Sequence, residues 1–150
     1  MAHTYTNIII HAVFSTKNRE PLLSKDIKTE LLNYLGGTVN KLGGHSLLVN
    51  GPADHVHMLL VQPASIPVSD MVEKIKSHSS GWVKKRWARY RGFAWQAGYA
   101  AFSVSKSQVD QVKEYIAGQE EHHKRVTFQE EVLAFLKKQG IAYDTRYVFD

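Results

Sequence analysis

The chain has 150 residues, of which 43% are hydrophobic and 22% charged, and it carries a formal net charge of +5. This composition is typical of a soluble globular protein, and no apolar run reaches the length of a membrane span. Cysteine is absent, which excludes disulfides and thiolate metal sites. The N-terminus lacks the pattern of a signal peptide, so we expect a cytoplasmic protein. The length predicts one domain, residues 1–150, with a sizeable core.

The first elements in chain order are a strand and a helix. Residues 7–15 are β-branched and apolar, which predicts a buried strand. Ser24 is placed to cap a helix over residues 25–42, whose apolar side chains recur at helical spacing. Gly43 and its neighbouring glycine end that helix.

A hairpin follows the first helix. Residues 45–50 and 55–62 predict two strands, and the Gly-Pro-Ala-Asp sequence of residues 51–54 predicts the turn between them. Residues i and i+2 of a strand point to the same face of a sheet. His55 and His57 should therefore stand side by side, with the hydrophobic side chains between and after them turned toward a core.

The pattern in the second half of the sequence predicts a helix that begins near Pro67 or Ser69. A strand-like stretch follows within residues 93–104. Ser107 precedes Asp110 by three residues, a spacing that resembles a capping box opening a last long helix. A further helical piece is expected over residues 128–138.

The order β-α-β-β-α-β followed by α predicts an α+β fold. It matches the ferredoxin-like split βαβ arrangement, an antiparallel sheet with helices on one face, plus a C-terminal tyrosine-bearing helix. Such a sheet leaves its other face free, and we expect His55 and His57 on that free face. Two imidazoles held on one rigid face form half of a metal site.

A basic segment runs from Lys74 to Arg91 without an acidic residue. Trp82, Trp87 and Tyr90 are interleaved with its charges. Basic side chains contact phosphates and aromatic rings stack on unpaired bases, which favours nucleic-acid binding, although a solvated helix face over core tryptophans has the same pattern. The basic residues are Lys74, Lys76, Lys84, Lys85, Arg86, Arg89 and Arg91.

Tyr115 and Gln119 are four residues apart, so a helix would place them on one face, one turn from each other. A tyrosine hydroxyl can attack a phosphodiester when a metal ion polarises the phosphate. Gln119 offers an oxygen to that metal, and Gly118 permits a bend in the helix. The alternative interpretation is a core tyrosine beside a surface amide. His123, four residues after Gln119, is a further histidine that could approach the metal.

With these motifs, the chain resembles a single-tyrosine transposase of the His-hydrophobe-His endonuclease superfamily, the TnpA type of minimal bacterial insertion sequences. The resemblance rests on residues 51–57 and 115–119, with Gly98-Tyr99 in the strand between them. It implies cleavage and rejoining of single-stranded DNA with hairpins through a 5′-phosphotyrosine intermediate, with Mg²⁺ or Mn²⁺. The implied roles are Tyr115 as nucleophile and His55, His57 and Gln119 as metal ligands.

The resemblance also implies a homodimer in which the tyrosine helix of one subunit completes the partner's site. Three alternatives stay open at the level of sequence. The first is a domesticated transposase associated with repetitive extragenic palindromes. The second is a non-catalytic module that binds single-stranded nucleic acid on the same fold. The third is a metal-dependent hydrolase in which Tyr115 is structural.

Overall fold

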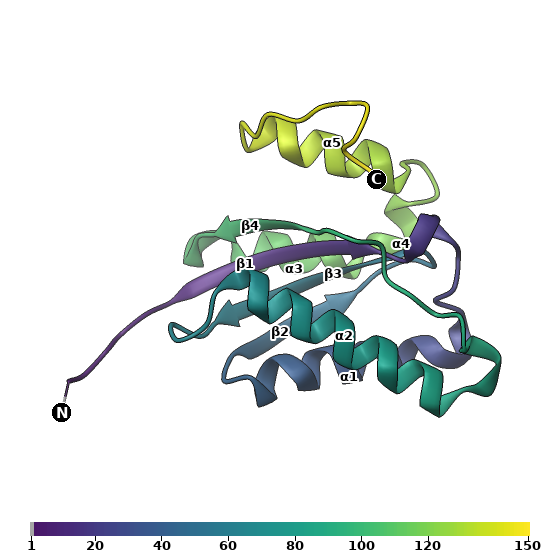
Figure 1. Cartoon of the computed structure of the whole chain (residues 1–150). Coiled ribbons are helices and arrows are strands. Elements are labelled where there is room, and N and C mark those ends of the chain that lie inside the picture. The colour runs from purple at the N-terminus through teal and green to yellow at the C-terminus, as the bar shows by residue number, and fades with distance from the viewer. Residues whose placement is uncertain (1) are drawn as a thin grey trace.

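The computed structural model describes residues 2–150, which form a four-stranded antiparallel sheet with helices on both faces (Figure 1). The strand order β2-β3-β1-β4 places the first and third strands at the centre of the sheet. This order confirms the predicted α+β, ferredoxin-like arrangement. The strands are β1 (Ile8–Ser15), β2 (His45–Asn50), β3 (His55–Gln62) and β4 (Ala100–Val104).

Five α-helices accompany the sheet in the described part of the chain. The predicted helix over residues 25–42 matches α1 to within one residue, and the piece predicted over residues 128–138 matches α5. None of the helices described is both long and apolar enough to span a bilayer. The helices are α1 (Lys25–Lys41), α2 (Val68–Arg86), α3 (Val109–Ala117), α4 (Gln119–His122) and α5 (Phe128–Lys138), with short 3₁₀ turns η1 (Lys17–Arg19), η2 (Ala88–Tyr90) and η3 (Lys106–Gln108).

The larger core lies between the sheet and the α1–α2 layer. Val56, Met58 and Leu60 of β3 are at most 1% exposed and belong to this core. Alternate residues of β1, among them Phe14, join them. The alternation read from the sequence is therefore confirmed, because the two histidines of β3 point to the opposite face.

The prediction of a free second face is wrong. Helices α3, α4 and α5 lie over that face (Figure 1), and His55 and His57 are 0% exposed beneath them. Ile116 of α3 packs on Leu59 of β3, and Phe128 of α5 packs on the face of β1. Both helices carry apolar stripes that are stable only against another surface.

Three local predictions also need correction. Only Ala100–Val104 of the stretch 93–104 forms a strand, because Gly98 adopts a φ of 85° just before it. Ser107 lies in η3 and does not cap α3, which begins at Val109 without a side-chain cap. The capping box of this region is at Thr127, whose side chain accepts from the Glu130 amide at the start of α5.

The expected last long helix is two helices. Gly118 ends α3, and α4 begins at the next residue, Gln119. Tyr115 and Gln119 therefore lie on either side of a break in the helix, which is where glycine was expected to permit a bend.

The turn before β3 fixes the position of His55. A Cβ atom on Gly51 would lie 2.1 Å from the carbonyl oxygen of His55, so only glycine fits this close approach of two backbone segments. The Asp54 carbonyl accepts hydrogen bonds from the Thr16 amide at 2.9 Å and the Thr16 hydroxyl at 3.0 Å. The turn is thereby fastened to the end of β1, and His55 enters the sheet at a defined position.

Candidate active site

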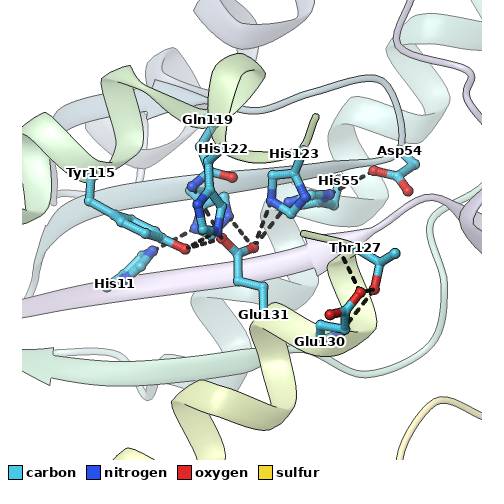
Figure 2. A network of polar contacts seen from close by, with 11 residues as sticks. His11, Asp54, His55, Tyr115, Gln119, His122, His123, Thr127, Glu130 and Glu131 are labelled. Carbon is cyan, nitrogen blue, oxygen red and sulfur yellow. Dashed lines mark hydrogen bonds and ion pairs between the residues drawn. The ribbon is translucent and has the colours of Figure 1, made fainter. Parts of the chain in front are cut away.

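Polar side chains from four elements and a connecting turn converge between α5 and the sheet (Figure 2). The centre of the cluster is the carboxylate of Glu131, which rises from α5 toward the histidines of β3. All the residues predicted for catalysis and metal binding lie around it in one chain. The cluster consists of His55 and His57 from β3, Tyr115 from α3, Gln119 and His122 from α4, His123 just after it, and Glu131.

Three imidazole nitrogens surround one oxygen atom of Glu131. Its Oε1 lies 2.9 Å from His57 Nε2, 3.1 Å from His123 Nε2 and 3.2 Å from His55 Nε2. The four donor atoms all lie within 4.8 Å of one another. Four potential ligand atoms at such mutual distances make this a candidate metal centre.

The two β3 histidines are held by their other ring nitrogens. His55 Nδ1 lies 2.7 Å from a carboxylate oxygen of Asp54, and His57 Nδ1 lies 2.8 Å from His11 Nε2. Such outer contacts orient the rings of metal-binding histidines and fix which nitrogen faces the metal. Both Nε2 atoms consequently point to the common centre of the cluster.

The second oxygen of Glu131 faces the tyrosine. Tyr115 donates its hydroxyl hydrogen to Glu131 Oε2, and the Gln119 amide nitrogen donates to the same oxygen at 3.2 Å. His122 Nε2 lies 3.3 Å away. One carboxylate therefore links the tyrosine hydroxyl to the three-histidine cluster.

The pKa directions follow from burial and from this network. Burial raises the pKa of Tyr115, and the Glu131 carboxylate raises it further. Burial opposes ionisation of Glu131, but its contacts with His55 and His57 outweigh that cost and hold its pKa well below the usual range. Burial lowers the pKa of His11 to about 3, so this imidazole is neutral.

Two predicted ligand atoms lack a hydrogen-bond partner. His55 Nε2 and Gln119 Oε1 are buried and unbonded in the described part of the chain, since the 3.2 Å contact of His55 with Glu131 lacks hydrogen-bond geometry. A buried polar atom without a partner costs about 1–3 kcal/mol. A divalent metal ion accepts electron pairs from both atom types, so the residues present fit the expected metal.

The predicted basic residues lie on a different layer. The segment begins in α2, across the sheet from the histidine cluster, although the C-terminal end of α2 and α4 lie at the same end of the sheet (Figure 1). Lys76 donates to the carbonyls of Gln96 and Gly98, each at 2.6 Å. Arg86 pairs with Glu30 and Arg89 with Asp26, whereas Lys74, Lys84, Lys85 and Arg91 are exposed.

Sequence reasoning missed Glu131. One signal for Glu131 existed. It lies three residues after Phe128 and four before Phe135, so a carboxylate occupies the apolar face of an amphipathic helix. Such a charge is 3% exposed here, and a buried carboxylate requires partners.

The sequence and fold define the class of the protein. The model of the family described as "Transposase IS200 like" matches residues 4–119. The chain therefore belongs to the IS200-like transposase family, which makes it a DNA transposase. The match ends at Gln119, so His123 and Glu131 lie beyond it. A comparison with curated proteins gives no match.

Two solved structures share the fold. A protein from Deinococcus radiodurans R1, described as a putative transposase, is 21% identical with a TM-score of 0.65, and the match covers 80% of this chain and 97% of that chain. A REP-associated tyrosine transposase bound to a REP hairpin is 15% identical with a TM-score of 0.61, covering 96% of this chain and 91% of the other.

Proposed function

We propose that this transposase, as one domain over residues 1–150, cleaves and rejoins single-stranded DNA through a 5′-phosphotyrosine intermediate. The observation that carries the proposal is the position of the Tyr115 hydroxyl, which shares the Glu131 carboxylate with His57. A nucleophilic hydroxyl beside imidazoles that could hold a metal ion is an arrangement suited to phosphoryl transfer.

Each residue then has a role in the reaction. The Tyr115 oxygen forms a bond to the phosphorus as the bond to the 3′ oxygen breaks. The proton lost by the tyrosine is balanced by the one that the leaving oxygen takes up to become a 3′ hydroxyl. Attack by a 3′ hydroxyl on the phosphotyrosine reverses these changes and rejoins the strand. His55, His57 and Gln119 would hold Mg²⁺ or Mn²⁺, which supplies positive charge to the phosphate and the leaving oxygen.

Access to the site is from the tyrosine side. His55 and His57 are 0% exposed, whereas Tyr115 and His122 are only partly buried. A phosphate group would therefore reach the cluster past Tyr115, which places the nucleophile at the entrance.

The DNA substrate is proposed to be single-stranded with hairpins. The resemblance implies this class, and one relative of the same fold is bound to a REP hairpin. The exposed basic residues named above offer phosphate contacts. Trp82 stacks on Tyr34 with ring centroids 4.4 Å apart and is partly buried, so one face of its ring is already occupied within the protein.

Binding should depend steeply on salt. Each phosphate contact with single-stranded DNA contributes a slope of roughly −0.7 in log K against log salt concentration. We expect Lys84→Ala to lower the magnitude of that slope by about this amount, because Lys84 is exposed, and Lys137→Ala on α5 to leave it unchanged. Fluorescence anisotropy of labelled hairpin oligonucleotides between low and high salt measures both. Salt-independent affinity, or tighter binding to plain duplex, would contradict this substrate class.

The arrangement of subunits is a separate question. The resemblance implies a homodimer in which the tyrosine of one chain serves the other. Of these two expectations we retain the homodimer as a proposal. In this structure the Tyr115 ring lies 5.8 Å from the His57 ring of the same chain. This geometry supports a site assembled within one chain.

Mixing two inactive variants tests the assembly. In a mixed dimer, one chain carries Tyr115→Phe and the other carries His57→Ala. If each site forms within one chain, both sites then contain one lesion. We expect no recovery of strand cleavage on mixing, with subunit exchange verified by differently tagged chains. Recovery to about half of wild-type activity per mixed dimer would show instead that Tyr115 is exchanged between subunits.

A further inference from the structure

His123 and Glu131 add ligand atoms to the pair on β3 (Figure 2). We propose that they complete, with His55 and His57, a nitrogen-rich centre that prefers a first-row transition ion such as Mn²⁺ over Mg²⁺. The same ion then fastens α5 to the sheet. This inference rests on the proposed function only in taking His55 and His57 as metal ligands.

The distances within the cluster fit a shared metal ion. Neighbouring ligands of a six-coordinate ion with bonds of about 2.1 Å lie about 3 Å apart. Glu131 Oε1 lies 2.9, 3.1 and 3.2 Å from the Nε2 atoms of His57, His123 and His55. Hydrogen bonding alone does not satisfy this group, because His55 Nε2 is left without a partner.

The buried charge of Glu131 also favours a bound metal ion. Glu131 is 3% exposed and stands on the apolar face of α5 between Phe128 and Phe135. A carboxylate in such a place is strongly disfavoured unless a cation faces it. Lysine and arginine do not contact Glu131 in the described residues, and its ion-pair partners are histidines alone. A divalent ion bound by these imidazoles would place its charge directly beside the carboxylate.

The donor types select the metal. Imidazole nitrogen suits zinc, copper, iron and nickel, and Mn²⁺ stands at the weak end of the same first-row series, whereas Mg²⁺ prefers oxygen ligands and keeps several waters. This centre offers three imidazole nitrogens against the Glu131 carboxylate oxygen and the Gln119 amide oxygen proposed above. The outer contacts of His55 with Asp54 and of His57 with His11 are those that support metal-bound histidines.

A ligand on α5 also couples the metal to the C-terminal segment. His55 and His57 belong to the central strands, while Glu131 is attached through α5, so a bound ion bridges the two. Metal binding should therefore protect the connection before α5 from proteolysis, since binding energy adds to the stability of docking. Trypsin can report this at Lys124 and Arg125, which are exposed just before that helix.

Calorimetric titration with MnCl₂ and MgCl₂ tests the proposal. We expect tighter binding of Mn²⁺ than Mg²⁺ to the wild-type protein, and loss of at least about tenfold in Mn²⁺ affinity for Glu131→Gln and for His123→Asn. Matched controls are Glu114→Gln and His45→Asn, which remove an exposed carboxylate from α3 and an exposed imidazole from β2. Mn²⁺ should slow trypsin cleavage at Lys124 and Arg125 in wild type and controls but not in the two site variants.

Melting curves with EDTA establish that each variant is folded. If Glu131→Gln does not fold, His123→Asn decides alone, because His123 is less buried. Unchanged Mn²⁺ affinity and unchanged protection in the folded site variants, with loss in His55→Ala, would overturn the proposal, as would tighter binding of Mg²⁺. None of these readouts involves the Tyr115–DNA adduct, so failure of the proposed function would be seen separately.

Discussion

Tyr115→Phe should abolish the covalent protein–DNA adduct and lower strand cleavage by at least about 10³-fold, as expected for loss of a nucleophile. Only the hydroxyl is removed, and the ring can keep its contacts with His11 and Phe135. Glu131 Oε2 still accepts from Gln119. Folding and DNA affinity should therefore persist. Denaturing gel electrophoresis of labelled single-stranded hairpin DNA measures the adduct, and anisotropy measures the affinity.

The matched control is Tyr99→Phe, which removes the hydroxyl of an exposed tyrosine beside β4. It should form the adduct at the wild-type rate. Wild-type cleavage by Tyr115→Phe would remove Tyr115 from the mechanism. In that event the alternative of a metal-dependent hydrolase with a structural tyrosine would be favoured.

His57→Ala should remove metal-dependent cleavage and most of the metal affinity. The substitution deletes an imidazole that is 0% exposed and lies 2.9 Å from Glu131. Losing a partner of a buried polar group costs about 1–3 kcal/mol, within the 5–15 kcal/mol by which a typical domain is stable. The variant should therefore stay folded, as should His55→Ala. Metal titration by calorimetry and thermal melts in EDTA on the same samples measure the two effects.

His45→Ala is the control, since His45 is an exposed histidine of the same sheet. It should change neither quantity. Normal metal affinity combined with lower stability in His57→Ala would show that the β3 histidines are structural. The two measurements therefore separate a ligand from a packing residue, which activity alone does not.

The spacing of residues close together in the sequence was sufficient to predict much of the fold. The two-residue spacing of His55 and His57 placed both on one face of the strand and Val56 on the other, because a strand has a fixed period of two. It did not show what covers that face. Glu131 contacts His57 across 74 positions in the chain, and the spacing of neighbours contains no information on such a contact.

Tyr115 and Gln119 were grouped by a helical spacing that the structure modifies. The helix breaks at Gly118, yet both side chains reach the same oxygen of Glu131. Because only four residues separate Tyr115 from Gln119, the two side chains stay close together although the regular helix does not continue. A prediction over four residues therefore survives one break in the helix. The position of α5, in contrast, depends on packing between distant elements.

Charge patterning overestimated the free positive surface. The segment from Lys74 to Arg91 contains no acidic residue. Two acidic residues of helix α1 nevertheless pair with it, Glu30 with Arg86 and Asp26 with Arg89. A count of charges within one segment does not include acidic partners that belong to another element. The exposed lysines of α2 are consequently better targets for mutation than the paired arginines.

The His11–His57 contact has a consequence for how the sheet tolerates a change at the site. When His57 Nε2 donates to Glu131, its Nδ1 carries no proton, so His11 must donate across their 2.8 Å contact. When His57 Nε2 instead gives its electron pair to an ion, Nδ1 carries the proton and His11 must accept. A neutral imidazole can do either by exchanging its tautomer, whereas a serine or an amide side chain would have to rotate. The central strand β1 thus holds an adaptable hydrogen-bond partner, and the backbone of the sheet can keep one conformation through loading and release.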